Sequence, residues 1–221
     1  MNILHLSDIH FGRNYPEYKV CDAFENKDRI LRELIQCISN IEEKKRPEHI
    51  VVTGDIAWWG KKKDFEEAYE WFSKLLESTG LEGKDITFCV GNHDVNHTYI
   101  SANRDLANNE VLRIDNIYSY DWVHEMEPPI YEYDRFCERI GMEPFIYPLK
   151  GEMEYSYSLG YKDVKFSSGN TIRFLAFNTA LFSCLPKIQN DKMWIGQKQI
   201  RGANTITDSR LWILRRRGFR M

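Results

Sequence analysis

The 221-residue sequence has no long hydrophobic run, although 43% of its residues are hydrophobic. About 20 consecutive apolar residues are needed to cross a bilayer, so we expect no membrane-spanning helix and no membrane partner. The N-terminus also lacks a basic leader, and Asp8 comes too early for the apolar segment of a signal peptide. We therefore expect the chain to stay in the cytoplasm.

The five cysteines are odd in number, and no two of them form a Cys-x-x-Cys pair. This spacing argues against a zinc knuckle and against a disulfide framework. Reduced thiols, most of them buried, are the remaining interpretation. The cysteines are Cys21, Cys37, Cys89, Cys137 and Cys184.

The net charge is negative outside the C-terminal end. Residues 201–221 contain six arginines and one aspartate, a net charge of +5, which leaves −8 for residues 1–200 of the total of −3. Lysine and arginine make most phosphate contacts in nucleic-acid complexes, so an acidic body disfavours nucleic acid as a partner. We expect residues 201–221 to be a poorly ordered basic tail. The alternative is that this tail, with Trp212 and Phe219 among its arginines, binds an acidic partner.

The first half of the sequence alternates short apolar runs with amphipathic stretches. The runs have the size of buried strands, and the stretches carry apolar residues at helical spacing. The second helix is expected to begin at Asp64, with Glu67 completing a capping box, and to end before Gly80. This order predicts an α/β fold with a parallel sheet covered by helices on both faces. The predicted strands are 3–6, 49–53 and 86–90, and the predicted helices are 30–41 and 64–79.

The second half is less regular. Residues 97–150 are expected to form an insertion over the sheet, with a short helix at 131–140. Alternating tyrosines and serines predict a half-exposed strand at 155–159, and an apolar run predicts another at 172–177. No linker rich in glycine, proline or serine divides the chain, so residues 1–200 are predicted to form one domain.

Polar residues follow each of the first three predicted strands. The sequences are SDIH at 7–10, TGD at 53–55 and GNHD at 91–94. The carboxyl ends of parallel strands share one edge of a sheet, where ligands bind. Asp8 and His10 are two residues apart, so on an extended backbone both side chains point to the same side. A polar residue at one strand end is usually a turn or a helix cap. Three such strand ends along one sheet edge predict a metal site instead.

The ligand types narrow the choice of metal. Aspartate, histidine and asparagine without a thiolate suit Mn, Fe, Zn or Mg better than a structural zinc site. Carboxylates so close together would repel one another strongly unless a cation lay among them. A catalytic divalent ion is therefore the prediction for this edge.

The motifs DIH (8–10), GDIAWWG (54–60) and GNHD (91–94) resemble, in order and spacing, the conserved blocks of the calcineurin-like metallophosphoesterases. The ordered triplet is specific where each block alone is not. The resemblance covers residues 1–96, and FLAFNTA (174–180) resembles a later strand of the same domain. It implies a four-layer α/β/β/α sandwich with two divalent metal ions at the sheet edge.

The resemblance also implies the activity and the role of each matching residue. A water bridging the two ions becomes the hydroxide that attacks a phosphate mono- or diester, possible substrates including nucleotides. His93 donates a proton to the leaving oxygen or binds the phosphoryl oxygen, and Asp94 polarises His93 through its other ring nitrogen. The metal ligands implied are Asp8 and His10 for the first ion, Asp55 bridging both ions, and Asn92 for the second.

The sequence departs from the family pattern in its second half. Later histidines and a Gly-His-x-His block are expected there, but no histidine follows His124, and the resemblance fades after Gln197. The second ion would keep only Asp55 and Asn92, so we expect this site to be depleted. We also expect the domain to be incomplete at its C-terminus, in a truncated or frame-disrupted copy. The alternative function is a catalytically dead relative that acts as a binding protein, or a gene remnant.

Four other side chains allow two interpretations each. His97 either replaces a missing ligand or, as we expect, lies on a solvent-facing loop. His5 is either a metal ligand or, as we expect, hydrogen-bonded in the core. Trp58 and Trp59 either line the site, where they would stack on a base, or contribute to ordinary packing.

Overall fold

The computed structural model describes residues 1–12, 23–96, 98–99, 120–145, 159–180 and 203. Most of the predicted insertion and the alternating tyrosines before Leu159 lie outside these residues. His97 and, apart from Ala203, the predicted basic tail lie outside them as well.

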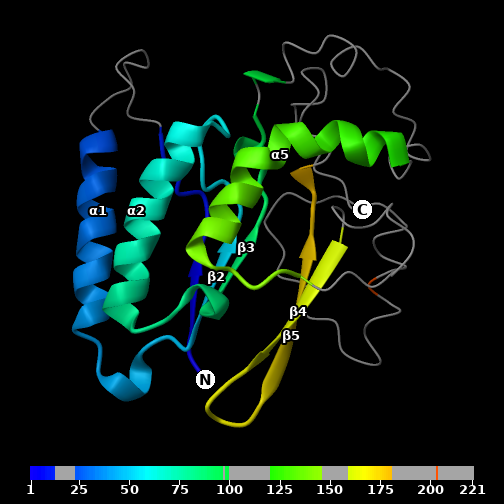
Figure 1. The fold of residues 1–221 in the computed structure, drawn as a ribbon. Helices are drawn as coiled ribbons and strands as arrows, with labels where there is room; N and C mark the ends of the chain where they lie inside the picture. Colours follow the sequence, from blue (N-terminus) through cyan, green and yellow to red (C-terminus); the bar gives the residue numbers. More distant parts are fainter. Residues whose placement is uncertain (13–22, 97, 100–119, 146–158, 181–202, 204–221) are drawn as a thin grey trace.

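Three parallel strands form the centre of the described structure (Figure 1). They are β1 (Ile3–Leu6), β2 (His49–Thr53) and β3 (Ile86–Cys89), in the order β1-β2-β3. Each is joined to the next through a helix, as a parallel connection requires. The predicted β-α-β-α-β order and the parallel sheet are confirmed.

The helices pack with the sheet into one hydrophobic core. Helices α1 (Ala23–Ser39), α2 (Lys62–Thr79) and α5 (Tyr120–Ile140) all contribute to it. Its centre is aromatic: the ring of Phe88 lies 5.0 Å from both Phe72 of α2 and Phe136 of α5. Shorter 3-10 turns are η1 (Glu43–Lys45), η2 (Gly83–Asp85) and η3 (Asn92–Asp94).

All three helices begin earlier than predicted. Helix α1 covers Ala23–Ser39 rather than 30–41. Helix α2 begins at Lys62, and the Asp64 carboxylate accepts hydrogen bonds from the backbone N–H groups of Trp59 and Lys61. Asp64 is therefore the third residue of the helix rather than the first, and its carboxylate caps the backbone N–H of Lys61 and also fixes the loop at Trp59. Helix α5 begins at Tyr120 rather than 131, because the chain accommodates Pro128 and Pro129 inside a helix that bends (Figure 1).

The opposite face of the sheet contacts a β-hairpin rather than helices. The hairpin consists of the antiparallel strands β4 (Leu159–Lys165) and β5 (Thr171–Phe177). Fully buried His49 of β2 stacks on Phe174 of β5, with ring centroids 5.4 Å apart. Within the described residues, the expectation of helices on both faces is therefore wrong. The four-layer sandwich stays a prediction.

β1 is more exposed than an apolar run suggests. Leu4 and Leu6 pack against the core, but Ile3 and His5 on the other face are exposed. β1 pairs only with β2 among the described strands, so its alternation is that of a strand covered on one side. His5 donates to or accepts from the Thr53 hydroxyl at 2.9 Å, but it lies outside the core.

Two broader expectations concern thiols and membranes. The described cysteines are free thiols, but only Cys137 is buried, whereas Cys37 is exposed and Cys89 intermediate. The expectation that most thiols are buried is therefore wrong for the described cysteines. Among the described residues, a helix with the length and apolarity of a bilayer span is not found.

Buried His49 should make the stability of the fold depend on pH. Its Nε2 pairs with the Thr87 hydroxyl at 2.8 Å, whereas Nδ1 is buried without a hydrogen-bond partner. Burial, with Lys162 nearby, lowers the pKa of His49 from 6.5 to about 4. Between about pH 6.5 and 4, His49 is therefore protonated in the unfolded chain but neutral in the folded chain, so the free energy of unfolding decreases as the pH drops through this window.

We expect wild-type protein to lose about 1.4 kcal/mol of unfolding free energy per pH unit in that window, about 3 kcal/mol in all, relative to His49→Phe. Urea unfolding between pH 7 and 4 measures the difference. His5→Gln, which changes an exposed histidine, should retain the wild-type slope. A parallel pH profile for wild type and His49→Phe would refute the assignment.

Candidate metal centre

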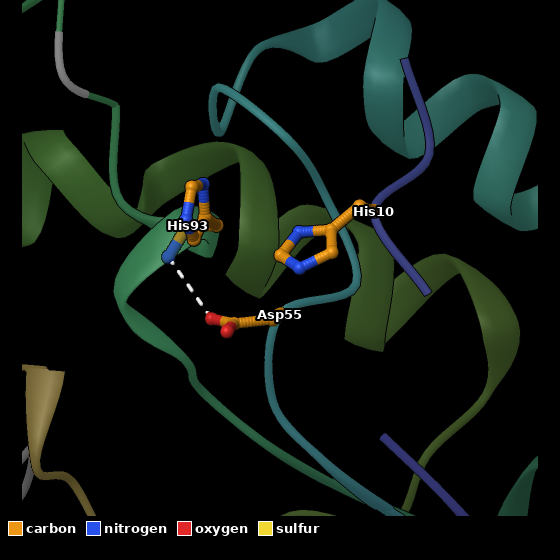
Figure 2. Close-up of side chains that lie close together, drawn as sticks. All are labelled: His10, Asp55 and His93. Carbon is orange, nitrogen blue, oxygen red and sulfur yellow. Dashed lines mark hydrogen bonds between the residues drawn. The ribbon is translucent and has the colours of Figure 1, made fainter. Parts of the chain in front are cut away.

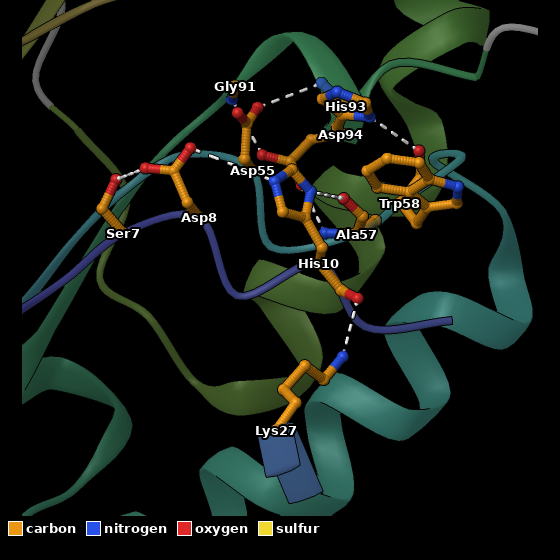
Figure 3. A network of polar contacts seen from close by, with 10 residues as sticks. All are labelled: Ser7, Asp8, His10, Lys27, Asp55, Ala57, Trp58, Gly91, His93 and Asp94. Atoms are coloured by element: carbon orange, nitrogen blue, oxygen red, sulfur yellow. Dashed lines mark hydrogen bonds and ion pairs between the residues drawn. The ribbon is translucent and has the colours of Figure 1, made fainter. Parts of the chain in front are cut away.

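The loops after β1, β2 and β3 meet at the carboxyl edge of the sheet (Figure 3). The backbone N–H of His10 donates to the carbonyl of Asp55 at 2.9 Å, and that of Asp8 to Gly54 at 3.2 Å. Parallel pairing then resumes between Phe11 and Ala57. The Asp8–His10 and Asp55 segments are therefore held together by the sheet that they leave.

Three site residues have left-handed backbone conformations. The φ angles are 60° for Asp8, 56° for His10 and 56° for Asp55. Non-glycine residues seldom adopt such angles, each at a cost of about 1–3 kcal/mol, and they cluster at functional sites. The expectation of an extended backbone at Asp8 and His10 is thus wrong. Their side chains still meet, because two left-handed turns redirect them.

A carboxylate and two imidazoles converge at this edge (Figure 2). The ligand-type atoms of His10, Asp55 and His93 all lie within 4.8 Å of one another. Asp55 is 97% buried, and its Oδ1 accepts the backbone N–H of His93 at 3.1 Å. Each of the three residues comes from a different loop, so the folded sheet alone brings them together.

The backbone fixes how both imidazoles are protonated. Nδ1 of His10 lies 3.3 Å from the carbonyl oxygen of Ala57, and Nδ1 of His93 lies 2.9 Å from that of Trp58. A carbonyl can only accept, so each Nδ1 carries a hydrogen and the lone pair of a neutral ring is on Nε2. Histidines that bind metals usually donate their second ring N–H in this way.

The two other predicted ligands lie beside this group. Oδ1 of Asp8 is 4.0 Å from Nε2 of His10, and the Ser7 hydroxyl donates to the other oxygen of Asp8. Asn92 is half-buried in η3, the turn that also carries His93. The structure therefore places all four predicted ligands on three adjoining loops, and it adds His93, which the resemblance kept away from the metals.

The contacts of Asp94 differ from those expected. Its fully buried carboxylate accepts the N–H groups of Ala57 at 2.7 Å and Gly91 at 2.8 Å. The Nδ1 of His93 contacts Trp58 instead. The expectation that Asp94 polarises His93 through a ring nitrogen is therefore wrong. Asp94 joins the second loop to the third through two charge-assisted hydrogen bonds.

The site is set up to receive positive charge. Burial lowers the pKa of His10, and the neighbouring His93 lowers it further, while Asp55 and Asp8 raise it. Burial raises the pKa of Asp94 to about 7, although its N–H donors act in the opposite direction. The only lysine drawn at the site in Figure 3, Lys27, donates to the backbone carbonyl of His10 at 2.8 Å. Clustered carboxylates beside two imidazoles together favour a cation.

Sequence comparison identifies the family. A family model described as calcineurin-like phosphoesterase matches residues 1–191. The match covers most of the chain, so the protein belongs to the calcineurin-like phosphoesterase family. No curated protein matches the chain.

The residues present fit a divalent ion of the kind that this family binds. Two imidazoles and a carboxylate within 4.8 Å, with the Nδ1 hydrogens held by carbonyls, form a donor set for a divalent transition metal. His10, Asp55 and His93 are thus a metal-ligand-like group.

Gly91 allows the second and third loops to approach each other. A Cβ at this position would overlap both the backbone nitrogen and Oδ1 of Asp55. We expect Gly91→Ala to displace the Asp55 carboxylate and to weaken Mn²⁺ binding at least tenfold, with a stability loss of about 1–3 kcal/mol. Calorimetric Mn²⁺ titration and urea unfolding measure the two effects.

Gly80→Ala is the matched control. Gly80 has a left-handed φ of 73° at the end of α2, and an added Cβ would meet nothing within 4 Å. This variant should lose stability but keep its Mn²⁺ affinity. Equal affinities for Gly91→Ala and wild type would show that the Asp55 position tolerates the extra carbon.

Proposed function

We propose that the protein hydrolyses phosphate mono- or diesters with the help of divalent metal ions at the carboxyl edge of the β1-β2-β3 sheet. The convergence of His10, Asp55 and His93 carries this proposal, together with membership of the phosphoesterase family. A phosphate-ester substrate is what the family implies, and nucleotides are within this class.

The proposal divides the work among the residues of the three loops. In this proposal His10 and Asp8 would hold the first ion, Asp55 would serve both ions, and Asn92 would serve the second. Bound divalent ions acidify water and neutralise the charge of a phosphoryl group. Asp94 acts as a positioning residue, since its carboxylate joins the loops that carry Asp55 and His93.

His93 is proposed to act on the phosphoryl group. Its Nδ1 hydrogen is held by the Trp58 carbonyl, so Nε2 is the nitrogen that we propose acts on the substrate. In the protonated ring, Nε2–H donates a proton to the leaving oxygen or a hydrogen bond to a phosphoryl oxygen. The centroids of the His10 and His93 rings are 4.7 Å apart, so the imidazole that would act on the phosphoryl group lies beside a proposed metal ligand.

The second ion is proposed to bind weakly. Asp55 and Asn92 supply one carboxylate and one amide, and water would fill the remaining coordination positions. The sequence has no histidine after His124 that might add a ligand. We therefore expect slow turnover from this chain.

Two histidines in the same chain segment provide the test. Chelator-treated protein should hydrolyse an aryl phosphate monoester or diester only after Mn²⁺ is restored. His10→Gln should abolish the Mn²⁺-dependent rate, whereas His5→Gln, altered on an exposed strand position, should retain it. Mn²⁺ binding without any turnover would favour a non-catalytic binding protein. Metal-independent hydrolysis would refute the proposal.

A further inference from the structure

Trp58 contacts His93 in two ways, through its indole ring and through its backbone carbonyl. Its indole lies parallel to the His93 imidazole, with ring centroids 4.6 Å apart and an interplanar angle of 17° (Figure 3). Its own carbonyl oxygen accepts Nδ1–H of the same ring at 2.9 Å. One residue therefore restrains both the plane of the His93 ring and its rotation within that plane.

The indole also contacts the second histidine of the site. The His10 ring meets Trp58 edge-on at 5.0 Å and His93 edge-on at 4.7 Å. The three rings thus form a mutual packing arrangement in which two imidazoles are held at a fixed angle of 80°. Aromatic pairs with these geometries contribute about 0.5–1.5 kcal/mol each beyond the burial of area.

The loop that carries Trp58 is itself fixed at both ends. The N–H of Trp58 donates to the Phe11 carbonyl at 2.9 Å, and the N–H of Trp59 donates to the buried Asp64 carboxylate at 2.9 Å. Gly60 follows with a left-handed φ of 64°, packed so closely against Val95 that a Cβ would not fit. A rigid support of this kind is what a positioning side chain needs.

We propose that Trp58 is a positioning residue for His93: stacking and the backbone carbonyl together keep the imidazole in one rotamer and one tautomer, beside the His10 ring and the Asp55 carboxylate. The effect of Trp58 on turnover rests on the function proposed above. Its effect on the orientation of the His93 ring does not depend on that function. Trp59, by contrast, meets Trp58 edge-on at 6.3 Å.

NMR of the metal-free protein tests the structural part without any activity. In wild type, the His93 ring protons should resonate upfield of those of exposed His5, because they lie over the indole face. Nitrogen shifts should report the Nδ1–H tautomer, and cross-relaxation should connect the His10 and His93 rings. Trp58→Leu should remove the cross-relaxation, and Trp58→Phe should restore it. Trp59→Phe is the control and should leave all three signals unchanged.

Activity tests the catalytic consequence. With Mn²⁺ restored, Trp58→Leu should lower kcat on the order of a hundredfold with little change in KM, and Trp58→Phe should recover most of the loss. An unshifted His93 in wild type, which needs no variant to fold, would overturn the inference. So would a retained His10–His93 contact in folded Trp58→Leu. If the NMR results are as expected but no variant or wild type hydrolyses esters, the proposed function fails and the positioning role stands.

Discussion

Replacing Asp55 by asparagine is expected to abolish tight metal binding while leaving the fold intact. The asparagine side chain has the same shape and still offers an oxygen to the backbone N–H of His93, which Asp55 accepts at 3.1 Å. It removes the negative charge that lies between His10 and His93. Loss of an outer partner of a metal ligand costs about 10–100-fold in affinity, so loss of a central ligand should exceed this.

Mn²⁺ titration of the two purified proteins measures the effect. Asp163→Asn is the matched control, because Asp163 pairs with Arg173 on the hairpin and not with the site residues. That variant should bind Mn²⁺ as wild type does. Undiminished Mn²⁺ affinity in Asp55→Asn would mean that the ion, if one binds, is held elsewhere.

The second large effect is expected from His93→Ala. If the imidazole acts on the phosphoryl group, its removal should slow turnover about a hundredfold to ten-thousandfold, the usual range for general acid catalysis. Mn²⁺ affinity should fall far less than it does in Asp55→Asn. Steady-state kinetics and metal titration on the same preparation give both numbers.

The ratio of the two losses decides the role of His93. Its ligand-type atom lies within 4.8 Å of those of His10 and Asp55, close enough for either role. If Mn²⁺ affinity and turnover fell by similar factors in His93→Ala, His93 would be a metal ligand. The His93→Gln variant, which keeps a hydrogen-bonding group, should recover little activity because an amide cannot donate a proton to a leaving group.

Much of the fold and the identity of the site follow from local pattern. Continuous apolar runs with helical stretches between them fix the order and the parallel pairing of β1, β2 and β3. Three polar strand ends then share an edge, since that is where parallel strands terminate. These are short-range signals that a single sequence carries in full.

What the sequence could not provide depends on contacts between distant segments. Asp94 was expected to contact its neighbour His93, but it accepts hydrogen bonds from Gly91 and from Ala57, which is 37 residues away. The carbonyl that holds His93 belongs to Trp58, in another loop. The left-handed turns at Asp8, His10 and Asp55 likewise depend on neighbouring loops, because aspartate and histidine do not by themselves require such angles.

The same limit applies to burial. An apolar run at 3–6 does not reveal that Ile3 lies on an exposed face, because exposure depends on which elements cover β1. His49 gave no signal of its special position, yet it is fully buried against Phe166 and Phe174 of the hairpin. Long-range packing decided both cases.

The most direct test of the account is to count the metal ions that chelator-treated protein binds during Mn²⁺ titration, with electron paramagnetic resonance to detect nitrogen ligands. We predict one tightly bound ion coupled to imidazole nitrogen, with the coupling diminished in His10→Gln, and a second ion that exchanges freely. Two tightly bound ions would contradict the weak second site. The absence of saturable Mn²⁺ binding would contradict the metal centre itself.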